Sequence, residues 1–292
     1  MNDAGRRLFI PVTRDTLPRV SEKYPFLYLE RGRLEIDDSS IKWLDADGNR
    51  VRLPVATLNT LLLGPDTSIT HEAVKVAAAS NCSVCWVGED SLLFYAAGIL
   101  PTANTRRLQR QARLSSDPKL SLEVAHALFA RRFPEADVSG RSLQELMGME
   151  GRRVQQLYAE MAETYHVGWK GRSYTPGRFE LSDVTNQILT ATNAALYGIL
   201  CSCVHSLGYS PHLGFIHSGS PLPFIYDLAD LYKRELCIDL AFSMTHTLAG
   251  EYNKYAVMDA FRTRVIENGL LEKVPKDLEE LIGEDRGRRH RQ

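Results

Sequence analysis

The spacing of apolar residues changes once along this chain, and that change sets the fold class. From about residue 24 to residue 64, short runs rich in β-branched and aromatic residues alternate with turn residues, as in FLYLE, RLEID, IKWL, VRLPV and TLNTLLLG. Beyond the hundredth residue, apolar residues recur at helical spacing in long segments almost to the end. We expect an α+β protein in which an N-terminal β-rich domain is followed by a larger all-α domain.

Local signals place the boundaries of these domains. THEAVKVAAASN predicts one short helix within the β-rich part, and DADGN predicts a hairpin turn at Asp47 and Gly48. Gly98 and Pro101 in GILPTANT indicate a linker. We therefore predict a β-rich domain over residues 1–98, a linker over 99–105, an α-helical catalytic domain over 106–283 and a basic flexible tail over 284–292.

Six segments of the helical part are each expected to run for several turns. One is GMEGRRVQQLYAEMAETYH, and another is PFIYDLADLYKRELCIDLAFSMTHTL. The fourth, LSDVTNQILTATNAALYGILCSCVHSLG, has a predicted N-terminal cap at Ser182 and a predicted end at Gly208.

Charge and hydropathy restrict the class of protein. Lys and Arg number 35 against 36 Asp and Glu, for a net charge of -1, so the chain as a whole has no preference for nucleic acid or membrane. The N-terminus lacks the apolar run of a signal peptide, and no uninterrupted apolar stretch approaches the roughly 20 residues that span a bilayer. We expect a cytoplasmic protein without a membrane partner, whose basic surfaces are local.

The five cysteines do not indicate a disulfide framework or a zinc site. Their number is odd. Cys82 and Cys85 fall in a predicted buried strand, where residues three apart point to opposite faces and cannot chelate one ion. Cys201 and Cys203 fall in a helical pattern without partners at zinc-ligand spacing. Reduced, mostly buried thiols are expected.

Asp227 and Asp230 place two negative charges three residues apart in an otherwise apolar segment. On a helix these positions share a face, so the carboxylates repel one another unless a cation or a proton intervenes. The alternative is a solvated stripe of ion pairs, because Lys233 and Arg234 follow at helical spacing. The segment alone leaves both interpretations open.

Glu150 and His217 add two further polar candidates. Glu150 lies four residues before Val154, which continues through Leu157 to Met161, so the carboxylate begins the stripe that should face the core and needs a partner there. The alternative is a glutamate in the first turn of a helix, stabilised by the helix dipole. His217 lies in a glycine-bounded loop, and most lone histidines are structural or solvated.

The order of these motifs carries a family resemblance. GYSPHLGFIHSGSPLPFIYDLADLYK, with Glu150 upstream in LMGMEGRRV and DVTNQILTATNAALYG between them, resembles the CRISPR-associated integrases that insert new spacers, specifically their subtype I-E branch. The similarity covers most of the chain and is weakest over the first twenty or so residues. A single motif of this kind is weak evidence, whereas the glutamate, the GFxHxGxP loop and the YDxAD helix in this order are highly specific.

The resemblance implies a metal site built from Glu150, His217 and Asp230, with Asp227 close by as a further catalytic residue. Carboxylates suit Mg²⁺ or Mn²⁺, and one imidazole among them favours Mn²⁺. A cation of this kind polarises a phosphoryl oxygen and steadies the attacking and leaving oxygens of phosphodiester exchange. The two neighbouring aspartates would then be tolerated because the ion neutralises them.

The implied reaction is transesterification, in which the 3′ hydroxyl of a short DNA fragment attacks a phosphodiester of the CRISPR repeat. The implied partners are double-stranded DNA with 3′ overhangs, CRISPR repeat DNA, a second copy of the chain in a homodimer, and a small ferredoxin-like CRISPR-associated protein. Two alternatives stay open: a metal-dependent endonuclease that uses water as its nucleophile, and a non-catalytic DNA-binding scaffold.

A local excess of positive charge indicates where DNA is held. Residues 101–178 contain 13 Lys and Arg against 8 Asp and Glu, in contrast to the whole chain. TRRLQRQAR places arginines along one helical face, and GWKGRSYTPGR mixes cations with Trp169 and Tyr174, which suits stacking on bases and contacts with phosphates. The alternative is a solvated basic surface. The candidate DNA contacts are Arg106, Arg110, Arg113, Arg152, Arg153, Lys170, Arg172, Arg178, Tyr197 and Lys233.

Two positions depart from the family pattern. Arg31 stands where a well-known relative has a tyrosine that braces the fork of the incoming DNA, so fork bracing by an aromatic ring is not expected here. Ser220 stands where relatives often carry a lysine after the histidine, so one phosphate contact is expected to be missing. Neither change touches the expected metal ligands.

Overall fold

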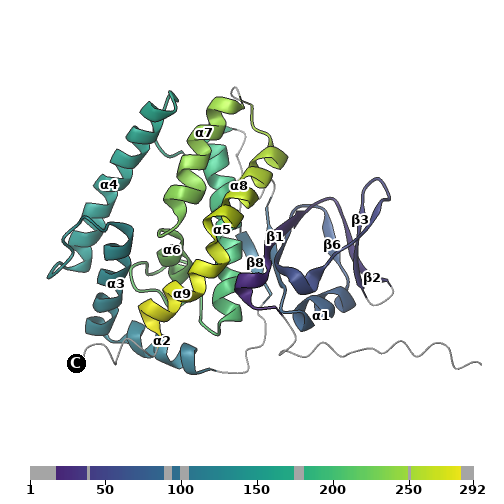
Figure 1. Cartoon of the computed structure of the whole chain (residues 1–292), viewed down its shortest axis with the longest axis horizontal. Coiled ribbons are helices and arrows are strands. Elements are labelled where there is room, and N and C mark those ends of the chain that lie inside the picture. Colours follow the sequence, from purple (N-terminus) through teal and green to yellow (C-terminus); the bar gives the residue numbers. More distant parts are fainter. Residues whose placement is uncertain are drawn as a thin grey trace, which may run out of the picture.

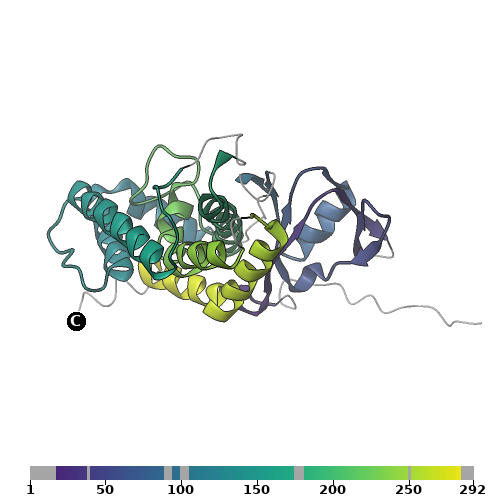
Figure 2. The same cartoon turned by 90° about the horizontal axis from the view of Figure 1, so that it is seen from above.

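The strands gather at one end of the molecule and the helices at the other (Figure 1). The computed structural model describes residues 18–37, 40–88, 94–98, 105–173, 181–248 and 251–283. A second view keeps the same division (Figure 2). The α+β class, with a β-rich N-terminal part before a helical part, is confirmed. Nearly all of the expected linker and the whole of the expected tail lie outside the described residues, so the domain boundaries stay predictions.

The first sheet contains the central parallel strands of the fold. Its strands are ordered β1 (Tyr24–Leu29), β5 (Leu58–Leu63), β7 (Ser83–Val87) and β8 (Phe94–Ala97); β8 alone is antiparallel to its neighbour. All six residues of β5 are buried. A strand covered on both faces is apolar on both, which accounts for the run of Leu61, Leu62 and Leu63 at its end.

The second sheet is smaller and contains the predicted hairpin. Its order is β4 (Arg50–Arg52), β3 (Ser40–Asp45), β2 (Gly32–Asp37) and β6 (Thr67–Ile69). Between β3 and β4 the chain turns at Gly48, whose φ of +83° is one that glycine adopts without a steric cost. The carboxylate of Asp45 accepts the backbone N–H groups of Asp47 at 3.0 Å and Asn49 at 2.8 Å. The turn predicted from DADGN is confirmed.

Two hydrophobic cores lie on opposite sides of the first sheet. Leu62 belongs to the large core that the sheet shares with the helical part, whereas Leu61 and Leu63 belong to a smaller core under α1 (His71–Ala79). Cys85 and Cys82 divide between the same two cores. The two thiols therefore face opposite sides of the sheet, as predicted, and burial raises the pKa of Cys82 to about 12.

The helical part follows β8 in sequence. The two short helices at its start are joined at Asp117, whose carboxylate accepts the N–H groups of Lys119 and Leu120 while Pro118 occupies the first helical position. In chain order the elements are α2 (Arg106–Ser116), α3 (Pro118–Arg132), α4 (Leu143–Thr164), α5 (Val184–Ser206), α6 (Pro223–Ala229), the π-helical turn η6 (Arg234–Ile238), α7 (Asp239–Thr247), α8 (Lys254–Asn268) and α9 (Leu270–Ile282).

Helix α5 is the centre of the helical part and packs against the first sheet. Its N-terminal cap is Asp183, which accepts the N–H of Asn186 at 2.9 Å, so the predicted cap at Ser182 is wrong by one residue. It ends as predicted before Gly208, whose φ is +82°. Among the described helices α5 is long and apolar enough to cross a membrane, but 83% of its most apolar window is buried within the protein, as in a core helix.

Helix α4 begins earlier than its apolar pattern indicates. Ser142 and Glu145 form a capping box, in which the Ser142 hydroxyl accepts the N–H of Glu145 and the Glu145 carboxylate accepts the N–H of Ser142. Glu150 therefore lies about two turns inside the helix. The alternative explanation of Glu150 as a first-turn residue favoured by the helix dipole is wrong.

The segment that carries both aspartates is not one continuous helix. After α6 the N–H groups of Leu231 and Tyr232 bond to carbonyls three residues back, at 3.1 and 2.9 Å, which tightens the last turn and ends the helix. Asp227 lies within α6, and Asp230 is the residue at its C-terminal cap. Asp230 keeps helical dihedral angles, and its N–H bonds to the carbonyl of Tyr226 at 3.1 Å, so the helix ends just after the second aspartate.

We predict that Gly198→Val lowers the free energy of unfolding by about 2 kcal/mol, the usual cost of overpacking a core. Gly198 lies where α5 meets β5, and a Cβ there would approach the Cδ2 atom of Leu62 to 2.8 Å. The matched control is Gly148→Val in α4, where a Cβ meets no atom within 4 Å. Urea denaturation of both variants checks the prediction, and equal stabilities would contradict it.

Candidate active site

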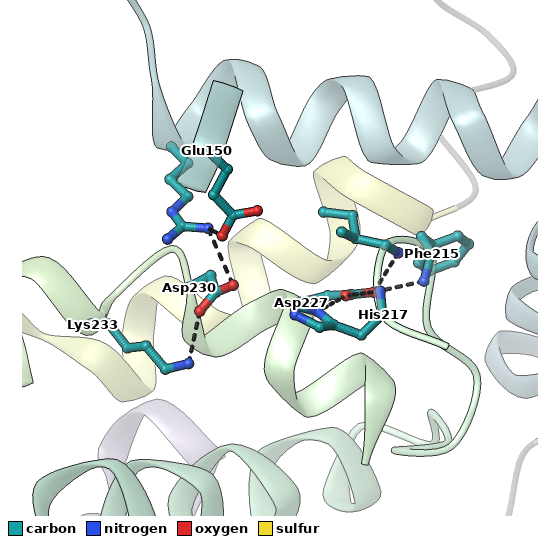
Figure 3. Close-up of polar contacts among 8 residues, drawn as sticks. Glu150, Phe215, His217, Asp227, Asp230 and Lys233 are labelled. Atoms are coloured by element: carbon teal, nitrogen blue, oxygen red, sulfur yellow. Dashed lines mark hydrogen bonds and ion pairs between the residues drawn. The ribbon is translucent and has the colours of Figure 1, made fainter. Parts of the chain in front are cut away.

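The candidate site lies where four segments of the helical part meet. Glu150 comes from the middle of α4, His217 from the loop before α6, Asp227 from α6 and Asp230 from its end (Figure 3). The guanidinium of Arg132, the last residue of α3, lies between the acidic side chains of Glu150 and Asp230. Residues from widely separated parts of the sequence are therefore brought to one place by helix packing.

Asp227 holds the histidine loop against α6. Its buried carboxylate accepts the backbone N–H groups of Phe215 at 2.6 Å, Ile216 at 3.2 Å and His217 at 2.9 Å. Gly214 allows the close approach, because a Cβ at that position would lie 2.8 Å from the Cβ of Pro223. A carboxylate surrounded by backbone donors is stabilised without a metal ion, so Asp227 has a positioning role in this structure.

Asp227 also orients the imidazole of His217. The Nδ1 atom of His217 lies 2.8 Å from Oδ1 of Asp227. This hydrogen bond outweighs the effect of burial and raises the pKa of His217, with further contributions from Asp227, Asp230 and Glu150 charges. A histidine whose Nδ1–H donates to a carboxylate keeps Nε2 available as a ligand, which is the usual arrangement of metal-binding histidines.

Glu150 and Asp230 both bind one nitrogen of Arg132. Nη1 of Arg132 forms an ion pair with Oε1 of Glu150 and another, at 3.1 Å, with Oδ2 of Asp230. The three side chains are only 17%, 17% and 12% exposed, so water screens these charges weakly. The two carboxylates thus converge on a single cationic atom.

Lys233 supplies the second positive charge of the site. Its ammonium lies 2.8 Å from Oδ1 of Asp230. Burial by itself would raise the pKa of Asp230, but Lys233 and Arg132 outweigh it and lower that pKa. Burial would likewise lower the pKa of Lys233, and the charge of Asp230 reverses this and raises it. Asp230 and Lys233 are therefore ionised together.

Two tyrosines lie beside this ion pair. The ammonium of Lys233 lies 5.2 Å from the ring centre of Tyr197, which packs edge-on against Tyr226 at 5.1 Å. The ring of Tyr226 in turn contacts that of His217 at 5.9 Å. Tyr197 and Lys233, predicted as DNA contacts, thus lie next to the predicted metal ligands.

The structure brings the predicted residues together but balances their charge differently from the expectation. Among the described residues, no three or more His, Cys, Asp and Glu side chains are arranged to hold a metal ion. Asp227 is bonded to backbone N–H groups, and Asp230 to Arg132 and Lys233, whereas the binding of an ion beside the two aspartates stays a prediction. The alternative of a solvated stripe is also wrong for Asp227, which is 1% exposed.

Two residues that shape the site were missed from the sequence. Arg132 ends an ordinary amphipathic segment, and only its position beside an acidic pair, which depends on the fold, distinguishes it from its neighbours. Gln111 in α2 is fully buried and clamps the start of the histidine loop: its side chain donates to the carbonyls of Ser210 and Leu213 and accepts the N–H of Ser210. A polar residue on the apolar face of α2 was the available signal.

The other predicted DNA contacts divide into two groups. Arg106, Arg113, Arg152 and Lys170 are exposed. Three others make contacts within the protein: Arg110 donates to the carbonyl of Ile282, Arg153 pairs with Glu135, and Arg172, which is also exposed, donates to Asn186 and Thr190. Arg178 and Tyr174 lie outside the described residues. The ring of Trp169 stacks on Tyr158 at 4.9 Å. DNA binding by this group stays a prediction.

We predict that Asp227→Asn lowers the free energy of unfolding by about 3 kcal/mol, because the amide replaces one acceptor oxygen by a donor that faces backbone N–H groups. Asp137→Asn is the matched control, since Asp137 accepts the N–H of Ser139 in an exposed turn. Thermal unfolding of both variants checks this. A melting temperature of Asp227→Asn equal to that of the control contradicts the anchoring role.

Comparison with known proteins supports the family resemblance that the order of motifs indicates. Residues 129–251 match the family described as CRISPR associated protein Cas1. The CRISPR-associated endonuclease Cas1 2 of Chlorobaculum tepidum is 63% identical over 285 residues, covering 97% of this chain and 96% of its own. The CRISPR-associated endonuclease Cas1 of Clostridium sp. strain SY8519 is 37% identical, covering 91% and 89%. The solved TtCas1–DNA complex is 40% identical, covers 88% of this chain and 91% of its own, and has a TM-score of 0.79. This chain belongs to the Cas1 family of CRISPR-associated proteins.

Proposed function

We propose that this protein is a metal-dependent DNA integrase that inserts short foreign DNA fragments into a CRISPR array. The observation that carries the proposal is the convergence of the Glu150 and Asp230 carboxylates on one cationic atom, next to a histidine fixed by Asp227. Membership of the Cas1 family also supports this proposal. The same site would serve CRISPR adaptive immunity against foreign DNA.

The donor atoms of the residues present are of the kinds that a divalent cation takes. Two carboxylates and one imidazole nitrogen are ligands that Mg²⁺ or Mn²⁺ accepts, and we assign them to Glu150, Asp230 and His217. The guanidinium of Arg132 supplies positive charge of the kind that a cation would supply, because it pairs with both carboxylates at once. A bound cation would polarise a phosphoryl oxygen of the DNA. Asp227 stays outside the ligand set, since its oxygens are already bonded to the loop.

The proposed reaction exchanges one phosphodiester for another. The 3′ hydroxyl of the fragment gives up its proton and its oxygen forms a bond to phosphorus in the repeat, the bond from that phosphorus to the repeat's own 3′ oxygen breaks, and the leaving oxygen takes up a proton. Lys233 is placed to stabilise negative charge that develops there, because its ammonium lies at the edge of the site beside Asp230 and Tyr197. This exchange of one phosphodiester bond for another requires no nucleotide cofactor.

Hydrolysis is the second candidate. The curated relatives from Chlorobaculum tepidum and Clostridium are both described as endonucleases, which favours a reaction in which water replaces the 3′ hydroxyl. The same residues would serve either nucleophile, so geometry alone does not separate the two. The products do, because an endonuclease leaves cut ends and an integrase leaves joined strands.

The proposed partners follow from the same assignment. The TtCas1–DNA complex supports DNA binding, and we propose double-stranded DNA with 3′ overhangs and CRISPR repeat DNA as the substrates. We also propose a homodimer, joined by a small ferredoxin-like CRISPR-associated protein. The GFxHxGxP loop and the YDxAD helix support the subtype I-E branch.

Replacement of Glu150, His217 or Asp230 by Ala should abolish strand joining, because each variant lacks one assigned ligand of the cation. Affinity for DNA fragments should change little, since phosphate contacts supply most of it. Strand joining is measured with a labelled fragment and a repeat-bearing plasmid in Mn²⁺, and DNA affinity by fluorescence anisotropy. Full joining by Asp230→Ala would remove that residue from the assignment.

Blocking the 3′ end of the fragment should separate the integrase from the endonuclease, because only transesterification uses that oxygen as its nucleophile. A fragment with a free 3′ hydroxyl should become covalently attached to the plasmid in the presence of metal and the partner protein. A 3′-dideoxy fragment of the same sequence is the control and should not be attached. Equal plasmid nicking with both fragments, without joining of either, would replace the integrase by the endonuclease.

A further inference from the structure

Arg132 occupies an unusual electrostatic position. Its Nη1 atom is shared between Glu150 and Asp230, the two carboxylates that the proposed function assigns to a divalent cation. An arginine that bridges two carboxylates normally uses its planar fork, with separate nitrogens for separate acceptors. Here both acids approach a single nitrogen, as they would approach a single ion.

The fold holds Arg132 in this position from both sides. The preceding residue, Arg131, pairs with Asp277 at 2.6 Å and with Glu280, both on α9, which fixes the end of α3. The guanidinium of Arg132 also lies 5.1 Å from the ring centre of Phe133. These contacts hold both the backbone and the side-chain plane of Arg132. Its ion pairs with Glu150 and Asp230 therefore belong to the packed structure.

Arg132 offsets part of the negative charge of the site. Glu150 and Asp230 contribute two negative charges, and Lys233 pairs with the Asp230 carboxylate through its other oxygen. Without Arg132 the two acids would repel one another across a weakly hydrated site. With Arg132 in place, a divalent cation can bind both carboxylates only after the guanidinium has released them.

We propose that Arg132 is a built-in counter-cation that competes with the divalent cation for Glu150 and Asp230. It positions both carboxylates in the metal-free protein and lowers the apparent affinity of the site for metal. This inference rests on the proposed function, because it concerns the same two ligands. It assigns Arg132 a positioning role toward the cation, which differs from a role in the chemical step.

The test is Mn²⁺ affinity, measured by the electron paramagnetic resonance signal of free Mn²⁺ during titration of the full-length protein without DNA. Arg132→Gln should bind Mn²⁺ about tenfold more tightly than the unmodified protein, because it removes the competitor; that factor corresponds to about 1.4 kcal/mol. Arg132→Lys, which keeps the charge without the guanidinium, should give a smaller gain.

Arg153→Gln is the matched control. Arg153 stacks on the same ring of Phe133, at 5.0 Å, and lies on the same helix as Glu150, but its ion pair is with Glu135. The Arg153→Gln substitution therefore removes an equal charge nearby without releasing Glu150 or Asp230. Its Mn²⁺ affinity should stay within about twofold of the unmodified protein, since the charge of Arg153 is already paired with Glu135 and makes no contact with either assigned ligand.

A second readout is the thermal stability of the metal-free protein. Arg132→Gln should melt at a lower temperature than the unmodified protein without metal, and its melting temperature should rise more when Mn²⁺ is added. If this variant does not fold, Arg132→Lys decides the question. Unchanged or weaker Mn²⁺ binding by the folded Arg132 variants, or an equal gain in Arg153→Gln, overturns the inference.

Glu150→Gln separates this outcome from failure of the proposed function. If Mn²⁺ binding by the unmodified protein does not depend on Glu150, the assigned metal site itself is wrong, and the inference falls with it. If Glu150→Gln abolishes Mn²⁺ binding while Arg132→Gln leaves it unchanged, the site stands and only the competition by Arg132 is refuted.

Discussion

The buried carboxylate of Asp227 is the interaction on which the geometry of the site depends. It accepts three consecutive backbone N–H groups and the imidazole of His217, so one side chain sets both the path of the loop and the direction of the ring. Leaving those donors without an acceptor in a buried place would cost several hydrogen bonds together. His217 can therefore face the other acids only as long as the Asp227 carboxylate stays in place.

The site is assembled from negative charges that are each compensated locally. Asp227 is balanced by backbone N–H groups and His217, Asp230 by Lys233 and Arg132, and Glu150 by Arg132. This local compensation allows three carboxylates to be packed among apolar helices. Under the proposed function, the site can therefore fold before it binds a cation, because each carboxylate already has a partner within the protein.

Sequence reasoning reached the fold class, the β5 run, the DADGN turn and the acidic residues of the site, because these depend on local periodicity or on an ordered set of motifs. It failed where the outcome depends on tertiary contacts. The start of α4 was hidden because Ser142 and Glu145 cap a turn that lacks a strong apolar pattern. The roles of Asp227 and Arg132 required knowledge of which loop and which helix end lie opposite them.

The end of α3 connects the stability of the helical part with the chemistry of the site. Adjacent arginines point to different partners, since Arg131 contacts α9 while Arg132 contacts Glu150 and Asp230. Asp277 on α9 also accepts the hydroxyl of Tyr232, which follows Asp230 by two residues. The same carboxylate therefore fixes both α3 and the turn after α6. Because Arg131 is next to Arg132 and Tyr232 is two residues after Asp230, one contact on α9 helps to position both members of the ion pair between Arg132 and Asp230.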